Sequence, residues 1–320
     1  MMEVKGKKLT FSTFAKKYGT VVALLVICLF FSVKTKAFLT PSNIITVVRQ
    51  ISMLATLGAG LTIVMITGRI DLSIGYGTSL LGIIVATLMV DFGLPIPVAA
   101  LITILFGALI GLLNGSLVAY AGIHDFIGTL ATGFLLSGIN QAYTKGHPVS
   151  GIPDGFKIFG DASFLGIPSM IYIMAAWLAV IALILGKTRF GRHVYAIGGN
   201  KEAAMMSGVN VKFNEMMTFT FRGVGMALTA LILTSRMGSA HPTAGDAYQM
   251  NAIATVYLGS TAFKEGEPNL LGTIIGALII GVLKNGMTLM NIDYYYQDIA
   301  QGILILFAVA VTSMQRSRKK

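Results

Sequence analysis

Eight polar residues stand within or beside long apolar runs of this 320-residue chain: Asp71, Ser73, Tyr76, Asn114, Asn140, Gln141, Asn251 and Asn285. Their carboxylate, hydroxyl and amide groups can exchange hydrogen bonds with a polar solute, or they can bind a neighbouring helix. In both roles they face the interior of a helix bundle, because exposing a polar group to lipid is unfavourable. The sequence leaves both roles open for each residue.

Catalytic chemistry finds little support in the sequence. The four histidines, His124, His147, His193 and His241, do not have the spacing of metal ligands. No Ser/His/Asp or paired-carboxylate arrangement can be recognised. The single cysteine, Cys28, lies in an apolar run and offers no disulfide or cysteine metal site. A phosphate-binding G-x-x-x-x-G-K-[ST] loop does not occur. We therefore expect no catalytic residue, metal or cofactor in this chain.

Composition predicts the elements that position these polar residues. Hydrophobic residues make up 55% of the chain, charged residues make up 12%, and the mean hydropathy is +0.77. Several apolar runs reach the roughly 20 residues that cross about 30 Å of hydrocarbon. We expect an all-α polytopic membrane protein with one transmembrane domain over residues 1–320. The ten predicted spans are residues 18–33, 44–67, 72–90, 95–121, 126–143, 168–186, 215–235, 247–262, 270–290 and 294–314.

Lysines and arginines are distributed unevenly between the two sides of these spans. With the N-terminus inside, inner segments carry sixteen of the 24, outer segments carry five, and three lie within spans. This bias follows the positive-inside rule and predicts that both termini and the polar segment 187–214 face the cytoplasm. The net charge of +11 then reflects topology, not nucleic-acid binding. The N-terminal apolar run lacks an A-x-A-like cleavage site, so we expect a retained first helix.

One or two segments are expected to be broken or re-entrant. Residues 68–77 (GRIDLSIGYG) set three glycines beside charged side chains, and residues 247–262 are barely long enough to cross. Irregular backbone at membrane depth is tolerated where it lines protein or a watery cavity. In addition, GALIGLLNG at 107–115 recurs as GALIIGVLKNG at 276–286 in a span of opposite direction. The recurrence indicates an inverted repeat, with chance small-residue packing as the alternative.

Four stretches carry a resemblance to a known family: 68–77, 188–211 (TRFGRHVYAIGGNKEAAMMSGVNV), 239–261 and 270–287. They resemble the integral membrane permease of bacterial simple-sugar ABC importers of the ribose, galactose and xylose type. The resemblance implies a type II importer-like fold in the bacterial inner membrane and transport by alternating access. The partners it implies are a second permease subunit, identical or related, two cytoplasmic ATPase domains that hold ATP and Mg, and a periplasmic sugar-binding protein.

The resemblance gives segment 187–214 the role of coupling to the ATPase. Within it, Asn200 is a plausible N-cap, Glu202 is acidic in the first turn, and Gly208 is a plausible stop for a short helix. Ala203 and Ala204 leave room for close docking, while Met205 and Met206 can fill an apolar groove on a partner. A solvated loop with a chance helix is the alternative. The predicted coupling residues are Arg189, Gly191, Arg192, Gly198, Gly199, Asn200, Glu202, Ala203, Ala204 and Gly208.

The same resemblance gives the eight polar residues of the spans the role of substrate path, because neutral sugars need weak hydrogen-bonding groups. Asp71 is favoured, although Arg69, where the family usually has glycine, can instead pair with it as a structural ion pair. Other cations near spans also need partners. Arg49 is expected to reach lipid headgroups. Arg222 can reach the membrane interface or pair with Asp125 or Glu215. Lys284 can reach headgroups or pair with Asp293 or Asp298.

Two connecting segments are expected to contact partners. The turn 259–269 departs from the family pattern with Lys264, Glu265, Glu267 and Pro268, and we expect it to adjust the ATPase contact. Loop 144–167 is the longest outer loop and is expected to contribute to docking of the binding protein. Two alternatives remain open. One is an ion-coupled secondary transporter that uses Asp71, and the other is an ABC permease for a nucleoside, amino acid, polyol or signalling furanose.

Overall fold

The computed structural model describes residues 11–263 and 266–317. Lys264 and Glu265 of the predicted ATPase-facing turn lie outside the described residues, as do Lys5, Lys7, Lys8, Arg318, Lys319 and Lys320 of the charge analysis. Ten long helices occupy the described ranges: α1 (Phe11–Lys34), α2 (Pro41–Ile66), α3 (Ile74–Val90), α4 (Ile96–Ala119), α5 (Asp125–Thr144), α6 (Ser169–Lys187), α9 (Val211–Met237), α10 (Asp246–Ser260), α11 (Leu270–Leu289) and α12 (Tyr294–Ser317). The short elements are η1 (Asp154–Phe159), β1 (Ser163–Phe164), β2 (Ile167–Pro168), α7 (Arg189–Gly199) and α8 (Lys201–Met206).

Each of the ten long helices corresponds to one predicted span, which confirms the all-α polytopic fold. Five of them, α2, α4, α6, α9 and α11, are long and apolar enough by themselves to cross a membrane, while α3 and the apolar part of α1 are shorter. The helices begin and end at local signals. Asn210 and Asn269 accept N-cap hydrogen bonds from Phe213 and Gly272, and Gly238 follows α9 in the left-handed conformation.

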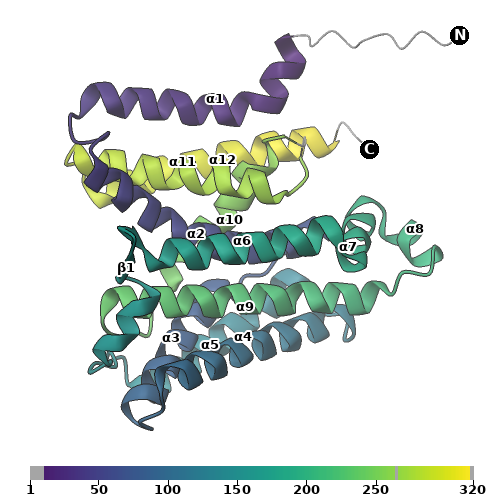
Figure 1. The fold of residues 1–320 in the computed structure, drawn as a ribbon. Helices are drawn as coiled ribbons and strands as arrows, with labels where there is room; N and C mark the ends of the chain where they lie inside the picture. Colours follow the sequence, from purple (N-terminus) through teal and green to yellow (C-terminus); the bar gives the residue numbers. More distant parts are fainter. Residues whose placement is uncertain (1–10, 264–265, 318–320) are drawn as a thin grey trace, which may run out of the picture.

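The long helices run side by side along one direction (Figure 1). The start of α1, the end of α12 and the α7–α8 segment lie at the same end of the molecule (Figure 1). The alternating order of the ten helices requires this arrangement, because an even number of crossings returns the chain to its starting side. We call this end the coupling end and the opposite one the distal end.

Helix contacts repeat in a pattern that relates α2–α5 to α9–α12. α4 packs against α9 while α11 packs against α2, and α3 contacts α9 while α10 contacts α2. The pairs α3 with α5 and α10 with α12 match in the same way, and α2 and α9 contact each other. Antiparallel packing of α2 on α9 is clear from Gly60 beside Arg222 and Met53 in one cluster with Ile232. Corresponding helices therefore run in opposite directions, as an inverted repeat requires.

The two recurring glycine motifs lie at the closest helix contacts. Gly107, Gly111 and Gly115 of α4 face the backbone of α9, where an added Cβ would overlap main-chain atoms. In the α11 copy, Gly276 faces the backbone of α10 in the same way, whereas Gly281 and Gly286 face the side chains of Ile51 and Phe31. Small residues let helix backbones approach closely in a membrane, where packing replaces the hydrophobic driving force. The motif thus serves packing in both halves of the repeat.

Candidate functional site

The chain leaves helical geometry between α2 and α3, and this break holds the main polar site. Residues 67–73 connect the two helices, with Gly68 in the left-handed region at φ +81°. Short α10, with 15 residues, spans only about 22 Å. The prediction of an interrupted segment at 68–77 is therefore confirmed, whereas 246–260 is a short but continuous helix.

Asp71 of this break forms an ion pair with Arg222 of α9. Arg222 Nη2 donates to Asp71 Oδ2, and both side chains have no exposed surface. Ser73 adds two hydrogen bonds to Asp71 Oδ1, from its backbone N–H at 2.8 Å and from its hydroxyl at 2.7 Å. Because a buried charge is unfavourable unless it is paired and hydrogen-bonded, this network fixes the α2–α3 break against α9.

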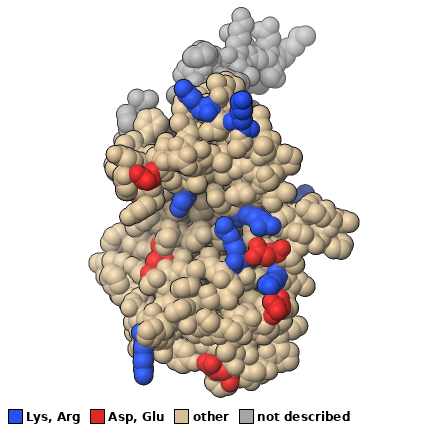
Figure 2. All heavy atoms as spheres, turned by 90° about the vertical axis from the view of Figure 1, so that its left-hand side faces the viewer, with Lys and Arg blue, Asp and Glu red and all other residues tan. Residues whose placement is uncertain are grey.

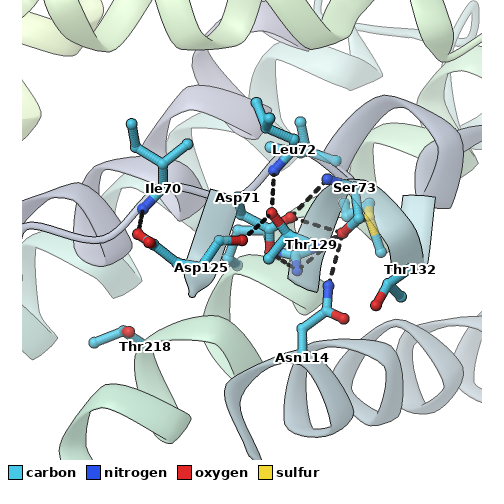
Figure 3. A network of polar contacts seen from close by, with 12 residues as sticks. Ile70, Asp71, Leu72, Ser73, Asn114, Asp125, Thr129, Thr132 and Thr218 are labelled. Atoms are coloured by element: carbon cyan, nitrogen blue, oxygen red, sulfur yellow. Dashed lines mark hydrogen bonds and ion pairs between the residues drawn. The ribbon is translucent and has the colours of Figure 1, made fainter. Parts of the chain in front are cut away.

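Further polar groups surround the ion pair (Figure 3). Asn114 of α4 donates to Ser73 Oγ at 2.8 Å, and its own Oδ1 has no hydrogen-bond partner among the described residues. The backbone N–H groups of Ile70 and Leu72 donate to Asp125 Oδ2 and Thr129 Oγ1 of α5, at 2.8 and 2.9 Å. Side chains of α5 therefore satisfy two backbone groups that the helix break sets free, while α4 and α9 bind side chains of the break.

The observed ion pairs differ from those considered in the sequence. Arg69 does not pair with Asp71, and Arg222 meets neither the interface nor Asp125 or Glu215. Instead, Arg69 binds Glu215 of α9, with Nη2 at 3.2 Å from Oε2. Arg69 therefore faces Glu215, whereas Asp71, two residues further along the break, faces Arg222 inside the bundle.

Glu215 connects this break to the coupling segment. Its side chain is 1% exposed, and its Oε1 also accepts a hydrogen bond from Lys201 Nζ at 2.7 Å. Lys201 is the first residue of α8, while Arg69 belongs to the α2–α3 break. One nearly buried carboxylate therefore binds two cations from separate elements, and sequence analysis did not assign Glu215 this role.

The α7–α8 segment has the predicted short exposed helix. Asn200 Oδ1 caps α8 by accepting from Ala203 N–H at 2.9 Å, and Gly208 follows it at φ +82°. Met205 and Met206 are 60% and 85% exposed, so two large apolar side chains project from the coupling end. Arg189, Arg192, Gly199, Glu202 and Ala203 are also exposed. Such a surface is suited to docking by another protein.

Three residues of the predicted coupling set make contacts inside the chain. Ala204 is buried with Ile197 and Val211, so its side chain packs within the segment, and its role in coupling stays a prediction. Gly191 is buried against the carbonyls that end α6. Gly198 is exposed, but a Cβ at this position would overlap the carbonyl oxygen of Ile66 at the end of α2. These contacts hold the segment against α2 and α6.

Substitution of the paired glycines tests this contact. Gly198→Ala is expected to push α7 away from α2 and to destabilise the local packing by about 1–3 kcal/mol. Gly199→Ala is a matched control, because a Cβ there meets no atom within 4 Å. Thermal melting of the purified protein and cysteine cross-linking of α7 to α2 measure the difference. Equal behaviour of the two variants would show that the contact is dispensable.

Tyr195 of α7 is within electrostatic reach of Glu267, a residue of the 259–269 turn. Burial raises the pKa of the Tyr195 hydroxyl, and the negative charge of Glu267 raises it further. An electrostatic effect of this kind requires the two side chains to be near one another. Glu267 of the turn therefore lies close to α7, on the side where ATPase contact is expected.

The remaining predicted path residues separate into different environments. Asn140 Nδ2 donates to the carbonyl of Pro242 at 2.7 Å, and Asn285 exchanges two hydrogen bonds with Asn43 of α2. Gln141 is exposed beside Ser137, and the Tyr76 ring packs on Phe134 at 5.9 Å. Three of these contacts join separate segments of the chain, whereas the contact of Gln141 with Ser137 lies within α5. Their role in a solute path stays a prediction.

Asn251 lies in a cavity at the distal end of the bundle. The cavity has a volume of about 240 Å³ and is bounded by α2, the end of α9, α10 and α11. Its lining residues are Gln50, Met53, Leu54, Arg236, Ala247, Tyr248, Asn251, Ile280, Gly281 and Lys284. Asn251 is one of the path residues predicted from the sequence, whereas Gln50 and Arg236 are not. No periodicity marks them, because they meet only when four helices pack.

Two further expectations concern the distal end. Arg49 pairs with Asp161 of the long loop at 3.6 Å, where lipid headgroups had been expected as its partner. The loop itself contains η1 and the β1–β2 hairpin, whose Phe164 and Leu165 are 66% and 83% exposed. Its exposed apolar tip is compatible with docking of another protein, which stays a prediction.

Ten packed helices around a buried polar break define a polytopic helical membrane protein. The chain belongs to the family described as branched-chain amino acid transport system / permease component, whose model matches residues 43–309. It is therefore a transport component.

Curated relatives cover nearly the whole chain. A ribose import permease protein of Bacillus subtilis (strain 168) is 38% identical over 310 residues, 96% of this chain and 96% of the relative. A ribose import permease protein of Haemophilus influenzae is 38% identical over 323 residues and covers 100% of both. A D-allose transport system permease protein of Escherichia coli (strain K12) is 35% identical over 306 residues, 95% of this chain and 94% of the relative. No solved structure gave a significant match.

Proposed function

We propose that this chain is the permease subunit of an ABC importer that moves a simple sugar or related polyol from a periplasmic binding protein into the cytoplasm. The family and the import functions named for the ribose and allose relatives support this proposal. The observation that carries it is the exposed α8 helix, which stands at one end of the bundle and is linked through Glu215 to the α2–α3 break. The path would open to either side by alternating access.

The partners follow from this proposal. Two permease subunits, identical or related, form the path in the bacterial inner membrane, and two ATPase subunits that hold ATP and Mg bind the coupling end. Exposed Met205 and Met206 supply the apolar contact, and Arg189 and Arg192 supply charge. With the coupling end inside, both termini face the cytoplasm, and loop 144–167 faces the binding protein.

Asp71 does not favour the ion-coupled alternative. A proton carrier must gain and lose its proton during each cycle, but protonation of Asp71 would leave the Arg222 guanidinium buried and unpaired. The arrangement instead suits a structural connection that persists through the cycle. Uptake by this chain alone, driven by a proton or sodium gradient in liposomes, would overturn the ABC assignment.

Reconstitution tests the proposed function directly. Proteoliposomes containing the permease and its cognate ATPase subunits are expected to take up labelled sugar only with ATP inside and the binding protein outside. Binding measurements on that periplasmic protein identify the solute and separate a sugar from a nucleoside or amino acid. ATP-driven uptake of a non-sugar solute alone would show that the sugar assignment is wrong.

A single substitution tests the docking surface. Met206→Glu is expected to weaken ATPase binding at least about tenfold, because it places a charge in an apolar contact that excludes water. Met237→Glu is a matched control, since Met237 is also exposed but lies at the distal end of α9. Affinity of the ATPase subunit for nanodisc-embedded permease is the measurement. Unchanged affinity for Met206→Glu would exclude α8 as the contact.

A further inference from the structure

The cavity at the distal end combines two kinds of polar group. Gln50 Oε1 and Asn251 Oδ1 are buried and have no hydrogen-bond partner among the described residues. Two cations, Arg236 and Lys284, line the same cavity. A buried acceptor without a donor is unfavourable by about 1–3 kcal/mol, so the amide oxygens are suited to receive donors from a bound molecule.

The cations of the cavity lack acidic partners within the described part of the chain. Neither Arg236 nor Lys284 takes part in an ion pair there, and no aspartate or glutamate is among the lining residues. The nearest acidic residue along α10, Asp246, accepts a hydrogen bond from Ser79 of α3. The lining is therefore positively charged, in contrast to the neutral path expected from the sequence.

The groups lie at different depths along their helices. Arg236 is the penultimate residue of α9, at the distal end, whereas Gln50 lies nine residues into α2, about 13 Å along that helix. Figure 2 views the distal end and shows a hollow near the middle of the face with basic side chains close by. Because Gln50 is set far below the helix end, lipid headgroups are poorly placed to satisfy its amide.

We propose that this cavity binds a small polyhydroxylated anion, a monosaccharide that carries a carboxylate, on its way through the permease. Hydroxyl groups of the sugar donate to Gln50 Oε1 and Asn251 Oδ1, and the carboxylate accepts from Lys284 and Arg236. The cavity volume of about 240 Å³ equals that of about eight water molecules at roughly 30 Å³ each. A cavity of this size can hold one monosaccharide. Tyr248 supplies an aromatic side chain to the same lining.

This inference deepens the proposed function and rests on it. It names the charge of the cargo and the residues that select it, whereas the relatives are named for ribose and D-allose, which carry no charged group. Positive side chains at the mouth also raise the local concentration of an anionic solute delivered from outside.

A matched ligand pair tests the proposal. D-galacturonate and D-galactose share their ring hydroxyls, but only the former carries a carboxylate. Saturation-transfer NMR with full-length permease in nanodiscs is expected to show tighter binding of galacturonate. Lys284→Met and Arg236→Met are each expected to weaken it by up to about fivefold, the range for a solvated ion pair, with little effect on galactose. Gln50→Leu is expected to weaken both ligands.

Controls separate the possible failures. Lys36→Met removes an exposed cation outside the cavity and is expected to leave both affinities unchanged. Equal binding of the two sugars, unaffected by Lys284→Met and Arg236→Met, would overturn the charge selection. If a neutral sugar is taken up with ATP and the cavity substitutions do not change that uptake, the proposed site is wrong while the permease function stands. Absence of ATP-driven uptake of any sugar with the partner subunits would overturn the proposed function itself.

Discussion

Replacing Asp71 by asparagine is expected to lower the free energy of unfolding by about 3–5 kcal/mol, because it leaves the Arg222 guanidinium buried beside a neutral amide. Arg222 has no exposed surface, and its Nε has no hydrogen-bond partner among the described residues, so water cannot compensate for the lost charge. Thermal or denaturant unfolding of the purified permease in micelles measures the loss. Reduced accumulation in membranes is the expected cellular consequence.

Two companion variants distinguish loss of the ion pair from general damage at the break. Asp125→Asn keeps an oxygen to accept from the Ile70 N–H, and it is expected to cost less than about 1 kcal/mol. The double variant Asp71→Leu with Arg222→Met removes both charges and is expected to recover most of the stability. If Asp71→Asn unfolds at the same temperature or denaturant concentration as the wild-type protein, the ion pair has no structural role.

Replacing Glu215 by glutamine is expected to reduce ATP-driven transport at least about tenfold while ATPase binding persists. The substitution preserves side-chain shape but removes the charge that joins Lys201 of α8 to Arg69 of the α2–α3 break. Both cations are partly exposed, so each can turn to solvent and the protein remains folded. Parallel measurement of sugar uptake and ATP hydrolysis in proteoliposomes detects uncoupling as hydrolysis without transport.

A double-variant comparison makes this prediction specific. Lys201→Met and Arg69→Met each break one of the two links, and each is expected to add little to the defect of Glu215→Gln because all three belong to one network. Lys34→Met removes an exposed cation at the distal end of α1 and is expected to transport normally. Additive defects, or coupled transport by Glu215→Gln, would show that motion passes by another route.

Helix α9 connects the residues of these two predictions. Glu215 and Arg222 are seven residues apart, which places them on one face about 10 Å from each other along the axis. Both hold the α2–α3 break, one through Arg69 and one through Asp71. A displacement of α8 would therefore act on α9 and on the break together. Two-state coupling of this kind needs a physically continuous network, which the ion pairs supply.

Much of the fold follows from local sequence. The ten helices correspond to ten apolar runs because a backbone in lipid must satisfy its own hydrogen bonds within each segment. The interruption at Gly68 and the short α8 helix with Asn200 and Gly208 at its ends were also predictable, since caps and left-handed positions depend on adjacent residues. The glycine motifs of α4 and α11 indicated the repeat because a recurring pattern of small residues can be seen directly in the sequence.

The sequence by itself determined the membrane class, the helices and the short exposed helix of segment 187–214. Only the tertiary structure decided which charges meet: Asp71 and Arg222 are 151 positions apart, and Glu215 lies 146 positions from Arg69. It also decided that Ala204 is buried and that Gln50, Arg236, Asn251 and Lys284 share one cavity. The physical reason is that apolar runs and caps act between near neighbours, whereas ion pairs and cavities depend on how separate helices are aligned and rotated against each other.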